Sequence, residues 1–170
     1  MQKPLPSEYN PYFQHYIDLT GDGDFFELFK KNTTETILFF ENIPVEKHDY
    51  RYAEGKWTTK EVLQHIIDTD RIFSFRALVA ARGDSEMPLN RVDENLFAKN
   101  VDVSNRSIES LLKEFTLVRN STEMFLANIN DAQSKFPANA VTYKITARAC
   151  GYIIMGHALH HIQVLKERYL

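Results

Sequence analysis

Apolar residues recur at helical spacing in four long stretches of the chain, and this pattern predicts four amphipathic helices. The stretches are 25–42, 58–82, from Ser104 or Ser107 to 129, and from about 146 to the C-terminus. No segment alternates convincingly between apolar and polar residues as a strand would, apart from a short ambiguous patch at 141–145. Long amphipathic helices joined by loops predict an all-α four-helix bundle.

Several helix boundaries can be read from local signals. Asp22 or Asp24 can cap the first long helix. Thr58 and Glu61 form a capping box, in which each side chain can bond to the backbone amide of the other residue, so the second helix begins there. Gly83 suits the left-handed position that follows a helix end.

The segments between the helices are expected to be an arm and loops. Residues 1–23 combine prolines and glycines with tyrosines and a phenylalanine, which suggests an arm with a short helix, held to the body by its rings. Residues 83–103 are long enough for either a crossover connection or a lid over a site. Residues 130–145 are expected to form a second loop.

Composition and charge narrow the class of protein. The 170 residues, with 44% hydrophobic and 25% charged, indicate a single globular domain over 1–170. The net charge of −3 gives no reason to expect nucleic acid as a partner, and no apolar run is long enough for a membrane span. No signal peptide is visible, and the one cysteine, Cys150, excludes an internal disulfide, so we expect a cytoplasmic protein.

The candidate chemistry lies among the histidines of the last helix. His157 and His161 are four residues apart, so they share one helix face and could hold one metal ion. His160 is rotated away from that face and is expected to pack. The third ligand is expected to be His65 in the second helix, although a lone histidine on such a face is more often a buried, hydrogen-bonded residue than a ligand.

Two further residues lie near this set in the sequence. Asp68 lies one turn after His65 and could orient a ligand histidine or could be a solvated carboxylate; it is the weak candidate for a catalytic role. Cys150 lies two turns before His157, too far to share an ion, and is expected to be a core residue. Imidazole suits Zn, Ni, Fe and Cu, so ligand type alone does not choose the metal. We expect a divalent ion, Zn, Ni, Fe or Mn, and its identity stays open.

The sequence resembles the DinB-like (DinB/YfiT-type) superfamily, and the resemblance covers nearly the whole chain. It is carried by GKWTTKEVLQHIID at 55–68, RIFSFRA at 71–77 and GYIIMGHALHH at 151–161. The resemblance implies a four-helix bundle of up-down-down-up type with a crossing second connection, and a divalent metal held by His65, His157 and His161. It departs from the usual family pattern at Ala158, where a glutamate is common.

The resemblance also implies a class of function. The family includes S-transferases that use a low-molecular-weight thiol and an isomerase dependent on such a thiol, and members often form homodimers. We therefore expect a metal-dependent thiol S-transferase, or a related hydrolase or isomerase, that acts on a small molecule. The alternative is a non-enzymatic metal-binding module of a stress response.

Overall fold

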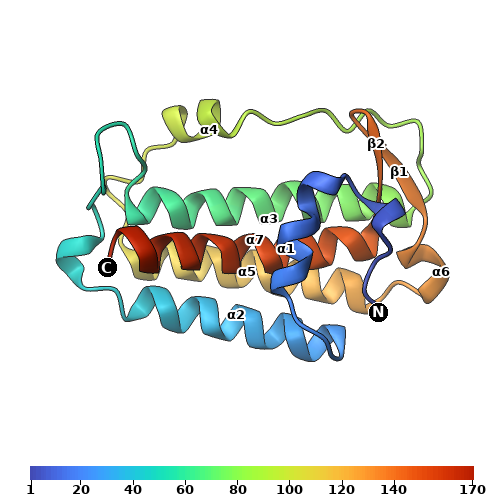
Figure 1. The fold of residues 1–170 in the computed structure, drawn as a ribbon, viewed down its shortest axis with the longest axis horizontal. Helices are drawn as coiled ribbons and strands as arrows, with labels where there is room; N and C mark the ends of the chain where they lie inside the picture. Colours follow the sequence, from blue (N-terminus) through green and yellow to red (C-terminus); the bar gives the residue numbers. More distant parts are fainter.

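Four long helices form a four-helix bundle in the computed structural model, which describes residues 1–170 (Figure 1). They are α2 (Phe25–Glu41), α3 (Thr59–Ala81), α5 (Ile108–Ala127) and α7 (Ala147–Arg168). Helices α3 and α5 run in one direction along the bundle, and α2 and α7 run in the other (Figure 1). The up-down-down-up bundle expected from the resemblance is therefore confirmed.

The ends of these helices follow the local signals in the sequence. Asp24, rather than Asp22, caps α2, and its carboxylate accepts hydrogen bonds from the amides of Phe26 and Glu27. Thr58 and Glu61 form the expected capping box at the start of α3. Ser107, rather than Ser104, caps α5.

The connections contain more regular structure than the pattern predicted. The stretch 130–145, expected to be a loop, ends in an antiparallel hairpin, and the loop after α3 contains a short helix. The arm contributes one short helix, as expected. The additional elements are η1 (Pro6–Glu8), η2 (Pro11–Phe13), α1 (Gln14–Leu19), η3 (Val45–Lys47), α4 (Glu94–Asn100), α6 (Asp131–Ser134), β1 (Pro137–Ala140) and β2 (Tyr143–Thr146).

The ambiguous patch at 141–145 overlaps β2, and β1 was not expected because it carries a weak strand signal. In β1 the inward residues are Ala138 and Ala140, small side chains of low strand propensity. The turn places Val141 at a φ of 57°, a conformation that a β-branched residue rarely adopts. The Val141 amide donates to the carbonyl of Leu89 at 3.1 Å, so tertiary contact with the crossover holds the hairpin in place.

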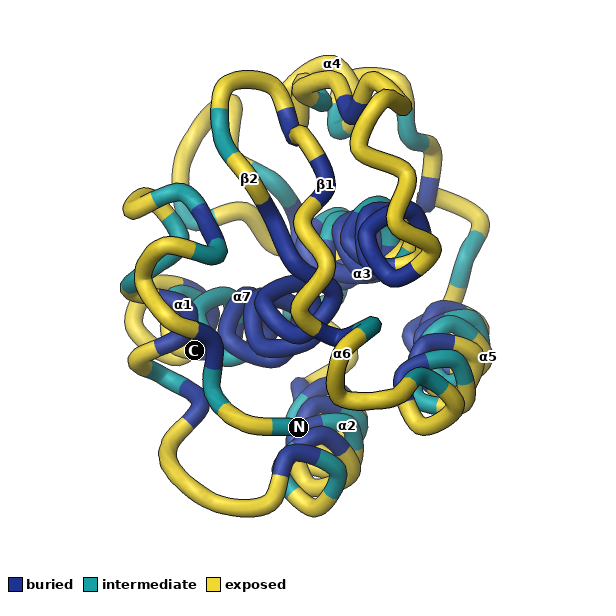
Figure 2. Tube along the Cα trace, turned by 90° about the vertical axis from the view of Figure 1, so that its right-hand side faces the viewer, coloured by how far each residue is buried: buried dark blue, intermediate teal, exposed yellow.

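Buried residues face the axis of the bundle, and the short elements cover one side of it (Figure 2). One apolar cluster surrounds Phe25 and Phe29, and a second surrounds Phe115. The guanidinium of Arg119 lies over the rings of Phe29 and Phe115, at 5.1 and 4.8 Å, and so joins the two clusters. No helix combines the length and apolar character that a membrane span needs.

Candidate metal centre

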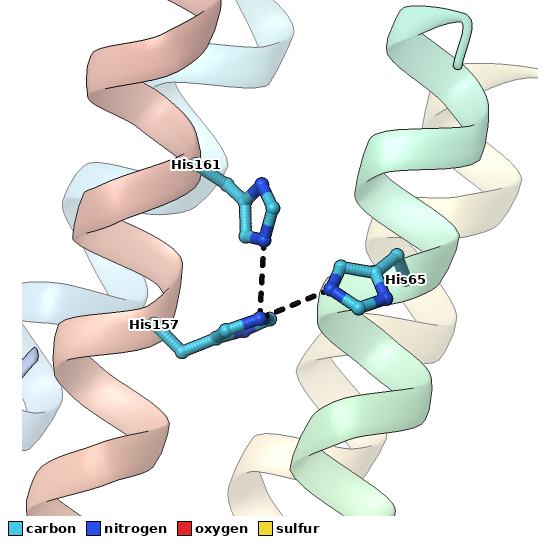
Figure 3. A group of neighbouring side chains, drawn as sticks. All are labelled: His65, His157 and His161. Carbon is cyan, nitrogen blue, oxygen red and sulfur yellow. Dashed lines mark hydrogen bonds between the residues drawn. The ribbon is translucent and has the colours of Figure 1, made fainter. Parts of the chain in front are cut away.

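Three histidines from two helices converge beside the bundle axis (Figure 3). His65 comes from α3, and His157 and His161 come from successive turns of α7. The Nε2 atom of His157 lies 3.0 Å from Nε2 of His65 and 3.1 Å from Nε2 of His161. The structure thus brings together the three residues that the sequence singled out.

The hydrogen-bonding chemistry of this cluster fits a cation. Nε2 of a neutral imidazole is either a donor or an acceptor, so Nε2 of His157 cannot satisfy both of its neighbours. A metal ion accepts lone pairs from all three nitrogens at once and removes this conflict.

Burial also favours the form of histidine that binds metals. Burial lowers the pKa of His65 to about 4, with a smaller contribution from His160. Burial lowers the pKa values of His157 and His161 well below the ordinary value as well, and neighbouring histidines add to the effect. All three rings are therefore neutral at pH 7, and a neutral imidazole is the coordinating species.

Aromatic rings position the histidines. Trp57 packs on His65 with ring centroids 4.7 Å apart, and Tyr16 packs on His157 at 5.5 Å. Nδ1 of His157 is buried and has no hydrogen-bond partner, so packing rather than a carboxylate sets the orientation of this ring.

Asp68 does not orient a histidine. Its carboxylate accepts a hydrogen bond from Nε2 of Gln64 at 3.0 Å and lies 3.6 Å from Arg71. Partners on its own helix hold it, and it makes no hydrogen bond to a histidine. Asp68 still lines the cleft described below, and burial raises its pKa, against the hydrogen bond from Gln64.

His160 packs instead against the arm, as expected. Its ring lies 5.7 Å from that of His15 and 5.4 Å from that of Tyr16, both in α1. Gly156 permits this approach, because a Cβ at that position would lie 1.9 Å from the carbonyl oxygen of Tyr16. A glycine inside a helix costs stability, so Gly156 is the kind of residue that marks such a close contact.

The histidines open into a cleft of about 710 Å³. Its walls come from α3, α7, the arm, the hairpin and the crossover, so the crossover segment also covers the site. Sequence reasoning assigned no functional role to three of its residues, Trp57, Arg76 and Tyr143, because nothing local shows that they face a cleft.

A buried polar network supports α7 just before the histidines. Arg119 donates through Nε to Asp70 at 2.5 Å and through Nη1 to Asn32 at 2.7 Å. The amide of Asn32 donates to the carbonyl of Met155 at 3.2 Å. Burial raises the pKa of Asp70 to about 6, and Arg119 opposes that rise. Through Asp70, Asn32, Arg119 and Met155 the network connects all four long helices.

Comparison with known proteins agrees with this architecture. The family model described as the DinB superfamily matches residues 28–165. YfiT from Bacillus subtilis, described as a probable metal-dependent hydrolase with an unusual four-helix bundle topology, superposes with a TM-score of 0.72 at 18% identity. That match covers 98% of this chain and 90% of YfiT. A DinB-like protein, YjoA of the same organism, superposes with a TM-score of 0.59 at 21% identity over 85% of this chain and 88% of its own. No curated protein sequence matches the chain significantly.

Proposed function

The chain belongs to the DinB superfamily, and from this premise we propose that its histidine cluster holds one divalent metal ion in an enzyme that acts on a small molecule. The observation that carries the proposal is the position of the three Nε2 atoms at the wall of an open cleft. A purely structural site would be expected to have a closed ligand shell without an adjoining cavity. The cleft therefore supports an enzyme over the alternative of a non-enzymatic metal-binding module.

The proposed reaction is transfer of a low-molecular-weight thiol to an electrophile, or a related hydrolysis or isomerisation. A divalent ion held by His65, His157 and His161 would lower the pKa of a thiol or water and polarise the electrophile. Hydrolysis is also the activity suggested for YfiT. Thiol transfer and hydrolysis need the same two features. The metal ion needs three protein ligands on one side and room for a substrate on the other.

The protein groups around the cluster have separate tasks in this proposal. Trp57 and Phe73 supply apolar walls that exclude water from the reacting groups. Asp68 is the carboxylate of the cleft wall with a raised pKa, and we propose it as the proton acceptor for the nucleophile. The histidines themselves are ligands and exchange no proton.

The test compares two variants of the same helix. Wild type, His157→Ala and His160→Ala are loaded with Zn, Ni, Mn or Fe and assayed for thiol conjugation to a model electrophile and for hydrolysis of a model ester. We expect turnover in the wild type and in His160→Ala, and loss of turnover in His157→Ala. Tight metal binding without any turnover would instead support the non-enzymatic module.

A further inference from the structure

One buried arginine of the cleft has no acidic partner. Arg76 lies on α3 eleven residues after His65, which is about three turns, so the two residues project from the same helix face. It is only 7% exposed. Its side chain lines the same cleft as the histidines, at a different part of the wall.

The two other buried arginines each have a carboxylate partner, which Arg76 lacks. Arg119 is paired with Asp70, and Arg148 is paired with Glu8. Arg76 has no carboxylate within 4.0 Å, although Asp68 and Glu94 line the same cleft. A buried cation without a counter-charge is costly, and folded proteins normally pair such groups.

The local contacts of Arg76 hold its guanidinium but leave most of its donors free. Nη2 donates to the carbonyl of Asn90 at 3.0 Å, and the group lies 5.0 Å over the ring of Phe73. The Tyr143 side chain also interacts with this guanidinium, although no further hydrogen bond from Arg76 to a protein acceptor lies within 3.5 Å. The guanidinium is thus fixed in place by Phe73 and Asn90 while its remaining N–H groups are available to a ligand.

We propose that Arg76 binds an oxyanion, a carboxylate or a phosphate, on the substrate of the enzyme proposed above. A guanidinium binds either group through paired hydrogen bonds, and these are stronger in a cleft shielded from water. The Cα atoms of His65 and Arg76 are roughly 16 Å apart along α3. The substrate therefore carries its anionic group well away from the bond that reacts. Binding of this group to Arg76 orients the substrate in the cleft.

Binding is measured by NMR of the ¹⁵N-labelled protein at constant ionic strength. The Nε–Hε resonance of Arg76 is assigned by its absence in Arg76→Gln, and Arg119 and Arg148 serve as internal references because carboxylates already occupy them. Succinate and inorganic phosphate are titrated separately into metal-depleted protein, so that neither anion can bind through the metal. Arg82→Gln, an exposed arginine outside the cleft, is the matched control variant.

We expect one of the two anions to shift the Arg76 resonance in a saturable manner, and the better anion identifies the group. Arg76→Gln should weaken binding of that anion at least about tenfold, and Arg82→Gln should leave it unchanged. If neither anion moves the Arg76 resonance more than chloride does, or if Arg76→Gln binds as tightly as the wild type, the inference is wrong.

The proposed function is tested separately by metal content. One ion per chain without anion binding at Arg76 would overturn this inference alone. Anion binding at Arg76 in a protein that takes up no metal would support the anion site and refute the metal-dependent enzyme.

Discussion

Substitution of Gly156 by alanine tests how closely the arm lies on α7. A Cβ at this position would lie 1.9 Å from the carbonyl oxygen of Tyr16 and 2.8 Å from its Cα. These are backbone atoms, so no rotamer change relieves the overlap. Restoring an ordinary contact moves α1 away by roughly 1.5 Å.

The expected cost follows from two opposing effects. Overpacking of a well-packed contact costs about 1–3 kcal/mol, and more when backbone must move. Replacing a helical glycine by alanine returns about 1 kcal/mol of helix propensity. Because α1 also buries Tyr16 and Ile17 against α7, we place the net loss for Gly156→Ala at about 2 kcal/mol. For a chain of this size the melting temperature falls by about 4–8 °C.

Urea unfolding followed by far-ultraviolet circular dichroism measures this loss. Gly151→Ala is the matched control, because its Cβ would meet side-chain atoms of Phe25 at 2.7 Å and of Leu126 at 3.2 Å, which can adjust. We expect Gly151→Ala to lose less stability than Gly156→Ala. A Gly156→Ala protein as stable as the wild type would refute the close contact between α1 and α7.

Three further predictions concern buried groups. Asp70→Ala leaves Arg119 buried and unpaired, so the free energy of unfolding should fall by about 3–5 kcal/mol in urea titrations. Burial opposes ionisation of Glu8, but hydrogen bonds from Arg148 lower the pKa of this carboxyl below 4.5. The ion pair between Glu8 and Arg148 therefore stabilises the fold above pH 4.5. The stability difference between wild type and Glu8→Gln should therefore vanish as the pH falls through the lowered pKa. Burial raises the pKa of Cys150 to about 12, so a thiol reagent should label it only after unfolding.

The helices could be predicted because their signals are local. Thr58 and Glu61 form a capping box within one turn, and the apolar stripe of each helix depends only on the spacing of its own residues. The hairpin could not be predicted in the same way. Its alanine-containing strand and the strained Val141 depend on contact with Leu89, which is distant in sequence.

The residues of the candidate site likewise differ in whether the sequence alone can identify them. His157 and His161 could be identified from their spacing on one helix face, and the resemblance to the superfamily pointed to His65 as the third ligand. Arg76, Asp70 and Arg119 look like ordinary polar helix residues in the sequence, and only packing reveals that they are buried. Asp68 was expected near a histidine because of its spacing, but Gln64 on the same helix face binds its carboxylate instead. The homodimer and the cytoplasmic location stay predictions.

Metal content decides whether His65, His157 and His161 are ligands. The protein is incubated with Zn, Ni, Mn or Fe, desalted, and analysed by inductively coupled plasma mass spectrometry. We predict one divalent ion per chain in the wild type and in His160→Ala, and loss of that ion in His157→Ala. A wild-type protein without bound metal, or a His157→Ala variant that retains a full equivalent, would contradict the account.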